Sequence, residues 1–214
     1  PATMGSSLCS VAYTMSDFDD LVQKIKTCQL CSLSHKRTHA VPGEGSRTAD
    51  IIFIGEGPGF YEDQQGRPFV GPAGRLLEEL LASIDLKRED VYITNMIKCR
   101  APNNRDPLPG EIKACKPYLD KQLELIGPRV VVTLGRYSFA KFFPDEPIGK
   151  ARGRPRRWNG LTIYPMYHPA AALRNGNLRS LLEKDFLALP SILNGEPPED
   201  EKEPDPEAKQ LGFF

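Results

Sequence analysis

The segment IIFIGEGPG, residues 51–59, joins a short apolar run directly to a glycine-rich loop. Three further runs with the same β-rich character follow: VYIT at 91–94, VVVTL at 130–134 and LTIYPM at 161–166. They are largely continuous rather than alternating, which is typical of strands that are buried on both faces. These four runs predict a sheet with helices on both sides.

Helical patterns separate the four runs. The segment that begins at Ser16 is capped and amphipathic, and the longest one begins with a proline and stops at a glycine. The alternating order of strands and helices predicts an α/β fold, a three-layer α/β/α sandwich with a four-stranded, mostly parallel sheet. The predicted helices cover residues 16–28, 76–84, 109–127, 136–143 and 178–189.

The composition is that of an ordinary globular chain, since 40% of the 214 residues are apolar and 26% are charged. No apolar run approaches the roughly 20 residues of a membrane span, and the first residues lack the profile of a signal peptide. We therefore expect a cytoplasmic protein that does not contact a membrane.

The formal net charge of zero divides between two parts of the chain. Residues 195–210 hold seven acids and two lysines, a net charge of −5, so the remainder carries +5. This segment is also rich in proline and cannot offset its ordering entropy by burial. We predict a disordered leader (1–15), a mildly basic folded domain (16–194) suited to nucleic acid, and a disordered acidic tail (195–214).

Four of the five cysteines form a candidate metal site. Cys28 and Cys31 make a CxxC pair, Cys99 and Cys115 lie downstream, and Cys9 in the leader is interpreted as a bystander. Four thiolates can hold a [4Fe–4S] cluster or one zinc ion. The wide second pair favours the cluster, because each cysteine then binds its own iron. Unliganded core cysteines are a third alternative.

Ligands of parallel sheets bind at the carboxyl ends of the strands. The segments that follow three of the strands, 56–72, 95–109 and 167–176, are rich in Gly, Pro or Asn and should converge there. The first contains no Gly-Lys-Ser/Thr phosphate loop. We expect no helix to open at Gly59, which argues against a dinucleotide-binding fingerprint.

Each of these loops offers one candidate binding residue. Phe69 is either a core residue or a stacking surface for a planar ligand. Asn95, at a strand end, either satisfies local backbone or pairs its amide with a heterocycle. His168 is either a structural histidine or a catalytic group. Five of the eight residues 150–157 are basic, which indicates either a solvated hairpin or a phosphate-binding patch.

Five motifs in order then carry a resemblance: GEGPG, GRPFVGPAG, ITNMIKCR with PNNRDP, VTLGR and YHPAAALR. Together they resemble the family-4 uracil-DNA glycosylases of thermophilic archaea and bacteria, from about Cys28 to about Phe186. The resemblance implies a uracil-DNA glycosylase-like fold that binds single- and double-stranded DNA, flips out uracil and hydrolyses its N-glycosidic bond. The products would be free uracil and an abasic site for base excision repair.

The resemblance also implies roles for the candidate residues. Phe69 would stack on uracil, Asn95 would pair with O4 and N3–H, and His168 would stabilise charge on O2. Better-studied uracil glycosylases have an Asp where Gly57 stands, so Glu62, ahead of Glu56, is the candidate that positions water. The implied uracil contacts are Gly55, Glu56, Gly57, Gly59, Phe69, Asn95 and His168; the implied DNA contacts are Asn104, Arg152, Arg154, Ala170, Leu173 and Arg174; the implied [4Fe–4S] ligands are Cys28, Cys31, Cys99 and Cys115.

Two other classes of protein are compatible with these features. The four cysteines permit a ferredoxin-like electron carrier, and the missing Asp permits a catalytically silent module that binds uracil or nucleic acid. The terminal segment Gln210–Phe214 is similar to a shortened sliding-clamp-binding peptide, the alternative being an incidental apolar end. Release of free uracil from DNA separates the enzyme from both other classes.

Overall fold

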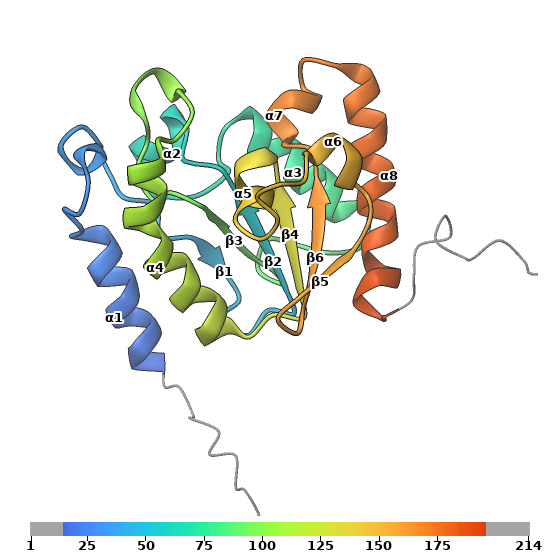
Figure 1. Ribbon diagram of the computed structural model, residues 1–214, viewed down its shortest axis with the longest axis horizontal. Coiled ribbons are helices and arrows are strands. Elements are labelled where there is room, and N and C mark those ends of the chain that lie inside the picture. Colours follow the sequence, from blue (N-terminus) through green and yellow to red (C-terminus); the bar gives the residue numbers. More distant parts are fainter. Residues whose placement is uncertain (1–14, 196–214) are drawn as a thin grey trace, which may run out of the picture.

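A six-stranded sheet lies at the centre of the structure, a computed structural model that describes residues 15–195 (Figure 1). The strand order is β1-β3-β2-β4-β6-β5. The four predicted strands are the inner ones and run parallel, as expected. The predicted count of four is corrected to six, because a short antiparallel strand is added at each edge. The strands are β1 (Glu44–Gly45), β2 (Ile51–Gly55), β3 (Tyr92–Asn95), β4 (Val130–Leu134), β5 (Arg156–Trp158) and β6 (Leu161–Met166).

The two edge strands were missed because two or three residues are too short to show a periodic pattern. One local signal was nevertheless present in the sequence. Asn159 and Gly160 join β5 to β6 with φ of 45° and 84°. Two positive φ values at an Asn-Gly pair are typical of the tight turn of a β-hairpin. The basic segment 150–157 therefore leads into a hairpin.

Helices cover both faces of the sheet, which confirms the predicted three layers (Figure 1). α3 (Pro72–Ala82) and α8 (Gly176–Leu193) pack on one face. α1 (Met15–Lys26), α4 (Pro109–Ile126) and α5 (Arg136–Ala140) pack on the other. The strands are thus buried on both sides, as their continuous apolar character indicated.

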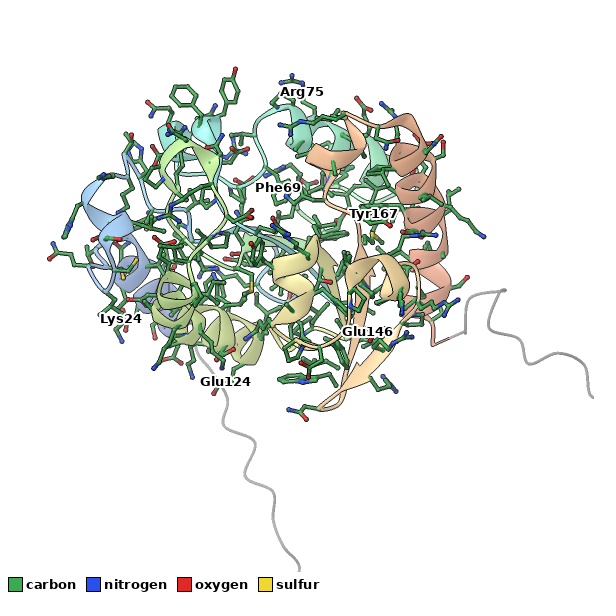
Figure 2. The ribbon with its side chains drawn as sticks, turned by 45° about the horizontal axis from the view of Figure 1, so that its top comes forward. Lys24, Phe69, Arg75, Glu124, Glu146 and Tyr167 are labelled. Atoms are coloured by element: carbon green, nitrogen blue, oxygen red, sulfur yellow. The ribbon has the colours of Figure 1, made fainter. Side chains whose placement is uncertain are left out.

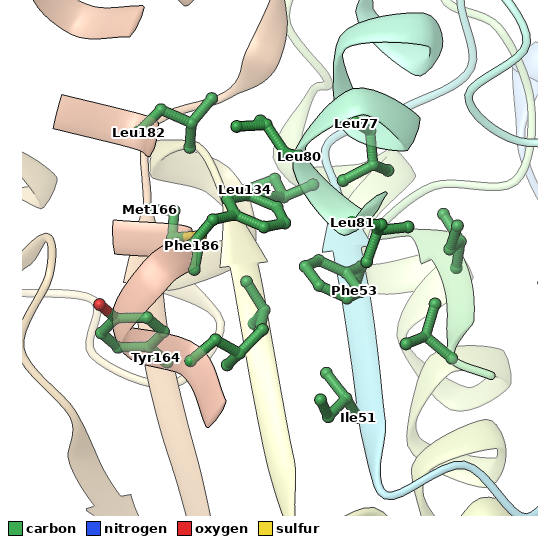
Figure 3. Close-up of a cluster of buried hydrophobic side chains, with 14 of the residues drawn as sticks. Ile51, Phe53, Leu77, Leu80, Leu81, Leu134, Tyr164, Met166, Leu182 and Phe186 are labelled. Carbon is green, nitrogen blue, oxygen red and sulfur yellow. The ribbon is translucent and has the colours of Figure 1, made fainter. Parts of the chain in front are cut away.

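Successive residues of β2 contribute to the two different cores. Ile51 and Phe53 belong to the cluster with α3 and α8, whereas Ile52 and Ile54 belong to the cluster with α1, α4 and α5. Figure 3 shows the first cluster, in which the rings of Phe53 and Phe186 stack with centroids 5.7 Å apart. This packing fixes the strand ends on which the functional loops begin.

A short helix, α2 (Phe60–Gln65), opens directly after Gly59. The prediction that no helix opens there is wrong. Six residues show no amphipathic pattern, and the helix depends on the Glu62 carboxylate, whose Oε2 accepts a hydrogen bond from the Gly59 amide at 3.1 Å. Gly66 ends it with φ of 68°. The remaining short elements are η1 (Ser32–His35), η2 (Pro102–Asn104), α6 (Ile148–Ala151) and α7 (Pro169–Ala172).

Several predictions concern the chain termini. The leader, Cys9, the acidic tail and the segment Gln210–Phe214 lie outside the described residues, except that position 15 begins α1 and position 195 follows α8. Among residues 15–195, no helix is both long enough and apolar enough to cross a membrane.

Candidate functional site

The three predicted loops meet around a cavity of about 440 Å³ at the carboxyl end of the parallel strands. Figure 2, in which this end comes forward, shows Phe69 between the loops and Arg75 at the outer edge. The strand order predicted this convergence. Of the candidate residues, those that line the cavity are Glu56, Gly57, Gly59, Glu62, Phe69, Asn95, Asn104, His168, Ala170 and Arg174.

Phe69 forms one buried wall of the cavity in a strained backbone conformation. Its φ is 51°, a left-handed value that costs a non-glycine residue about 1 kcal/mol or more. Arg88 holds this conformation, because its guanidinium donates to the carbonyls of Phe69 (2.9 Å) and Pro68 (2.6 Å). Arg88 is thus a positioning residue, and the sequence analysis missed it because no motif links it to a loop 19 residues away.

Asn95 lines the cavity and carries a buried, unpaired acceptor. Its side chain is 2% exposed, and Oδ1 has no hydrogen-bond partner within residues 15–195. A Cβ atom at Gly55 would lie 2.3 Å from Oδ1 and 2.8 Å from Phe69 Cζ, so only glycine lets both side chains approach. A buried polar atom without a partner costs about 1–3 kcal/mol. This acceptor therefore suits a ligand that donates a hydrogen bond.

The buried side chain of Lys98 forms hydrogen bonds with the last residues of β3. Lys98, which is 1% exposed, donates to Thr94 Oγ1 (2.6 Å), to the Asn95 carbonyl (2.8 Å) and to Gln122 Oε1 (2.6 Å). Burial lowers the pKa of Lys98 to about 7. In its protonated form Lys98 uses all three of its N–H groups, which fixes the backbone that carries the Asn95 side chain. Lys98 was not predictable from the sequence, because a buried lysine has no sequence signal.

His168 is a neutral hydrogen-bond donor beside Phe69. Burial lowers the pKa of His168 to about 4, although the Glu62 carboxylate opposes the shift. The Ala170 amide donates to Nδ1 at 3.1 Å, so the neutral ring carries its proton on Nε2. The rings of His168 and Phe69 are 24° from parallel, with centroids 5.6 Å apart. An aromatic wall and a donor therefore lie on the same side of the cavity.

The two candidate carboxylates have different surroundings. Glu62 Oε1 accepts from the amides of Val70 and Gly71, both at 2.9 Å, while Oε2 accepts from Gly59. Glu62 therefore holds the two ends of the first loop together. Glu56 accepts from the Tyr137 amide at the start of α5 (3.1 Å), and burial raises its pKa.

The glycines of the first loop leave no room for side chains. A Cβ atom at Gly57 would lie 2.8 Å from Ile97 Cγ1, and one at Gly59 would lie 2.7 Å from Glu62 Oε2. Gly57 therefore contributes only backbone atoms to the cavity, at the position where better-studied uracil glycosylases have an Asp.

Some of the predicted DNA contacts are accessible to a ligand, whereas another is already paired within the protein. Leu173 is 47% exposed beside Arg174, and Arg154 is exposed, so these three are accessible. Arg152 instead pairs with the buried Asp185, with Nη1 2.5 Å from Oδ1. Its charge is used within the fold, and the 150–157 patch is correspondingly less basic than its sequence indicates.

The four candidate ligand cysteines lie where the end of α1, the loop after β3 and α4 meet. Cys31 packs against the buried cluster that contains Cys99 and Cys115. Burial raises the pKa of Cys99, and the nearby thiols of Cys31 and Cys28 also raise it. The Arg37 guanidinium opposes this shift in part, because it donates to Sγ at 3.0 Å. All four are free thiols.

This arrangement bears on the choice between zinc and a cluster. In the part of the chain that the structure describes, no three His, Cys, Asp or Glu side chains are arranged to hold one metal ion. The donor set itself, four thiols from separate segments of the fold, fits a cluster in which each sulfur binds its own iron. The cationic Arg37 beside Cys99 suits thiolate ligands.

Comparison with known proteins gives consistent results. The profile of the Uracil DNA glycosylase superfamily matches residues 42–188. The chain is 48% identical over 193 residues to the type-4 uracil-DNA glycosylase of Saccharolobus solfataricus. The aligned region covers 86% of this chain and 89% of that protein. It is 45% identical to the type-4 enzyme of Archaeoglobus fulgidus (86% and 97% covered) and 43% identical to that of Thermotoga maritima (86% and 99% covered). The profile match includes all three loops of the cavity.

Proposed function

Because the chain belongs to the uracil-DNA glycosylase superfamily, we propose that it removes uracil from DNA. It is a monofunctional glycosylase that flips uracil out of the helix and hydrolyses the N-glycosidic bond, which leaves free uracil and an abasic site. The observation that carries this proposal is the unpaired Asn95 Oδ1 in a cavity that also contains His168.

Asn95 distinguishes uracil from cytosine. Its Oδ1 accepts the N3–H proton of uracil, and its amide nitrogen donates to O4. Cytosine has no proton on N3 and carries a donor at position 4, so both hydrogen bonds are lost. Because cytosine would leave buried polar groups unpaired, its binding should be less favourable than that of uracil by several kcal/mol. Phe69 stacks on the pyrimidine, and the backbone of Gly55–Gly59 holds its edge.

His168 stabilises the leaving group. Cleavage of the C–N bond gives the sugar oxocarbenium character and leaves negative charge on uracil, mainly at O2. The Nε2–H group of the neutral ring donates to this oxygen, and the donor is preorganised because Ala170 fixes Nδ1. No proton transfer from His168 is required.

We assign the hydrolytic water to Glu62, with Glu56 as the alternative. Glu62 lines the cavity, and a carboxylate offers about four acceptor sites, of which three hydrogen bonds to amides leave one. Glu62→Gln keeps one oxygen that accepts from the Val70 and Gly71 amides but loses the charge and the acceptor of the Gly59 amide, so it should lower turnover and also weaken the start of α2. Glu56→Gln should lower turnover if Glu56 holds the water instead.

We propose that Cys28, Cys31, Cys99 and Cys115 hold a [4Fe–4S] cluster with a structural role. When bound, the cluster supplies iron–thiolate bonds between segments that are distant in sequence. The cysteines would thereby join the end of α1 to the loop after β3 and to α4. A brown protein whose broad visible absorbance is bleached by dithionite would support the cluster over zinc.

Single- and double-stranded DNA are the proposed substrates. Arg174, which lines the cavity, and the exposed Leu173 and Arg154 would contact DNA, with Leu173 filling the emptied stack. Because the relatives come from archaea and bacteria, we expect the enzyme to work in a prokaryotic cytoplasm. That it works as a monomer stays a prediction. Binding of a sliding clamp through Gln210–Phe214 stays a prediction.

Product analysis tests the proposal. The full-length protein is incubated with single- and double-stranded oligonucleotides that contain one uracil, and free uracil and abasic sites are measured. We expect equal amounts of both products and no strand cleavage before alkali treatment. DNA binding without uracil release would instead support a silent binding module, and neither binding nor release would support an electron carrier.

A further inference from the structure

Two large aromatic side chains lie exposed beside the cavity. Phe60 and Tyr61 are 50% and 53% exposed, and their rings pack edge to face with centroids 5.6 Å apart. Both belong to the first turn of α2, which begins directly after Gly59 of the cavity wall. Neither is part of the buried clusters of residues 15–195. Their exposure is therefore not explained by the folding of the domain.

Arg100 joins this aromatic pair to the cavity. Its guanidinium carbon lies 5.2 Å from the centre of the Phe60 ring, and its Nε donates to Asn104 Oδ1 at 2.7 Å. Asn104 in turn lines the cavity. We call Phe60, Tyr61 and Arg100 the aromatic platform, and it is continuous with the rim through a single hydrogen bond.

The position of the aromatic platform is fixed by its contact with Gly71 of the first loop. A Cβ atom at Gly71 would lie 3.1 Å from Tyr61 Cδ2, so the ring rests against a position without a side chain. Glu62 accepts from the Gly71 amide, and the same carboxylate accepts from the Gly59 amide at the start of α2. The rings are therefore presented to solvent on a braced turn.

Exposed aromatic faces beside a cation have the chemistry of a surface that binds unpaired nucleobases. Stacking on an aromatic ring tolerates any base, and the nearby guanidinium favours the adjoining phosphate. We propose that the aromatic platform is a subsite on which an unpaired base next to the flipped uracil stacks. This proposal rests on the proposed function, which places uracil in the cavity. The platform favours single-stranded DNA, because in a duplex the neighbouring base stays stacked in its own pair.

Steady-state kinetics of the full-length protein test the subsite. The double variant Phe60→Leu/Tyr61→Leu keeps apolar side chains but loses both rings. We expect its KM for a single-stranded uracil oligonucleotide to rise at least fivefold, with kcat within twofold and the duplex KM within twofold of the wild type. Leu187→Ser, an exposed apolar position on α8 (63%), is the control and should change neither KM. An unchanged single-strand KM in the double variant overturns the proposal, as does an equal loss on both substrates.

A binding measurement separates this proposal from the proposed function. A single strand carries 2-aminopurine beside 2′-fluoro-2′-deoxyuridine, which resists cleavage, and a second strand has thymine in place of the uracil. The wild type should quench 2-aminopurine fluorescence, and the double variant should lose at least half of the quenching. Ring-dependent quenching without uracil release from an ordinary substrate would reject the proposed function and keep the subsite. Uracil release with equal quenching by both proteins would reject the subsite.

Discussion

At the scale of single residues, the site depends on side chains whose positions are enforced by their neighbours. The unpaired Asn95 Oδ1 is tolerated because Gly55 has no side chain and Lys98 fixes the backbone behind it. Phe69 keeps a left-handed backbone because Arg88 binds two carbonyls of its loop. The cavity is thus shaped before a base enters it, which lowers the entropic cost of recognition.

Replacement of Asn95 by Asp should change which base is preferred. A carboxylate still accepts a hydrogen bond from N3–H of uracil but no longer donates one to O4. It can also accept a hydrogen bond from the amino group of cytosine. We expect the ratio of kcat/KM for uracil over cytosine to fall at least tenfold, which corresponds to the loss of about one net hydrogen bond. Competition assays with duplexes that contain either base measure this ratio. An unchanged ratio would remove Asn95 from base recognition.

The low pKa of His168 predicts the pH dependence of the chemical step. A histidine with a pKa of about 4 is neutral throughout pH 5–8, so its Nε2–H donor is present across that range. Single-turnover rates should show no inflection near 6.5, and any limb due to His168 should appear near pH 4. His168→Ala should lower the rate about 10²–10³-fold and leave DNA binding within threefold. A histidine-dependent inflection near 6.5 would contradict a neutral donor.

The sequence revealed site residues that follow strand ends and missed those that act through tertiary contacts. Phe69, Asn95 and His168 were identified because loops after parallel strands must meet at one edge. Arg88 and Lys98 were not, because only the folded chain brings them to the carbonyls that they bind. The acidic side chain absent at position 57 was noted in the sequence, but its steric reason, contact with Ile97, required coordinates.

At the scale of elements, long apolar segments were predictable and short ones were not. The four parallel strands and the helices α1, α3, α4 and α8 have periodic or continuous apolar patterns that burial on both faces of the sheet requires. Strands β1 and β5 and helix α2 have too few residues for a pattern, and α2 is started by a side chain-to-amide bond. The start of α2 is also where the functional loop is braced.

The contact between α3 and the first loop predicts the effect of a glycine substitution. A Cβ atom at Gly74 would lie 1.8 Å from the Phe69 carbonyl oxygen, so Gly74→Ala must displace the loop. We expect the free energy of unfolding to fall by about 1–3 kcal/mol and uracil release to slow at least tenfold. Urea unfolding and single-turnover assays measure these effects.

Gly110 in the first turn of α4 provides the matched control. A Cβ atom there meets no other atom within 4 Å, so Gly110→Ala should be neutral or stabilise the protein by up to about 1 kcal/mol. Equal effects of the two substitutions would show that the Phe69 contact has no special importance.

The cysteines connect elements, so their loss should affect folding before chemistry. Cys99→Ala should lower the yield of soluble protein, the bound iron and the thermal midpoint, whereas Cys9→Ala should change none of them. Iron analysis, visible absorbance and thermal unfolding measure these effects. A soluble, fully folded Cys99→Ala protein without catalysis would contradict a structural cluster.

At the scale of the whole molecule, a formal charge of zero conceals two segments of opposite sign. Residues 196–214 carry −5 and the rest of the chain carries +5. Ion pairs such as Arg152–Asp185 use part of the positive charge within the fold, which the composition alone does not reveal. The cationic side chains that remain accessible beside the cavity are available to phosphates.

Removal of residues 196–214 should strengthen non-specific DNA binding at low salt. The acidic segment repels phosphates, and this repulsion is screened as ionic strength rises. Fluorescence anisotropy should show an affinity for undamaged DNA several-fold higher at 20 mM salt and nearly unchanged at 300 mM. Removal of 211–214 alone, which takes away no charged side chain, is the control. Equal affinity of the full-length and shortened proteins at low salt would contradict this interpretation.

Base release from mixed substrates tests most directly whether the cavity selects and releases uracil. Excess protein is incubated with equal amounts of duplexes that contain uracil, thymine or cytosine opposite guanine, and the free bases are quantified by mass spectrometry. We expect uracil to be released at least a hundredfold faster than either other base. Release of all three bases at similar rates, or of none from DNA that is bound, would contradict this expectation.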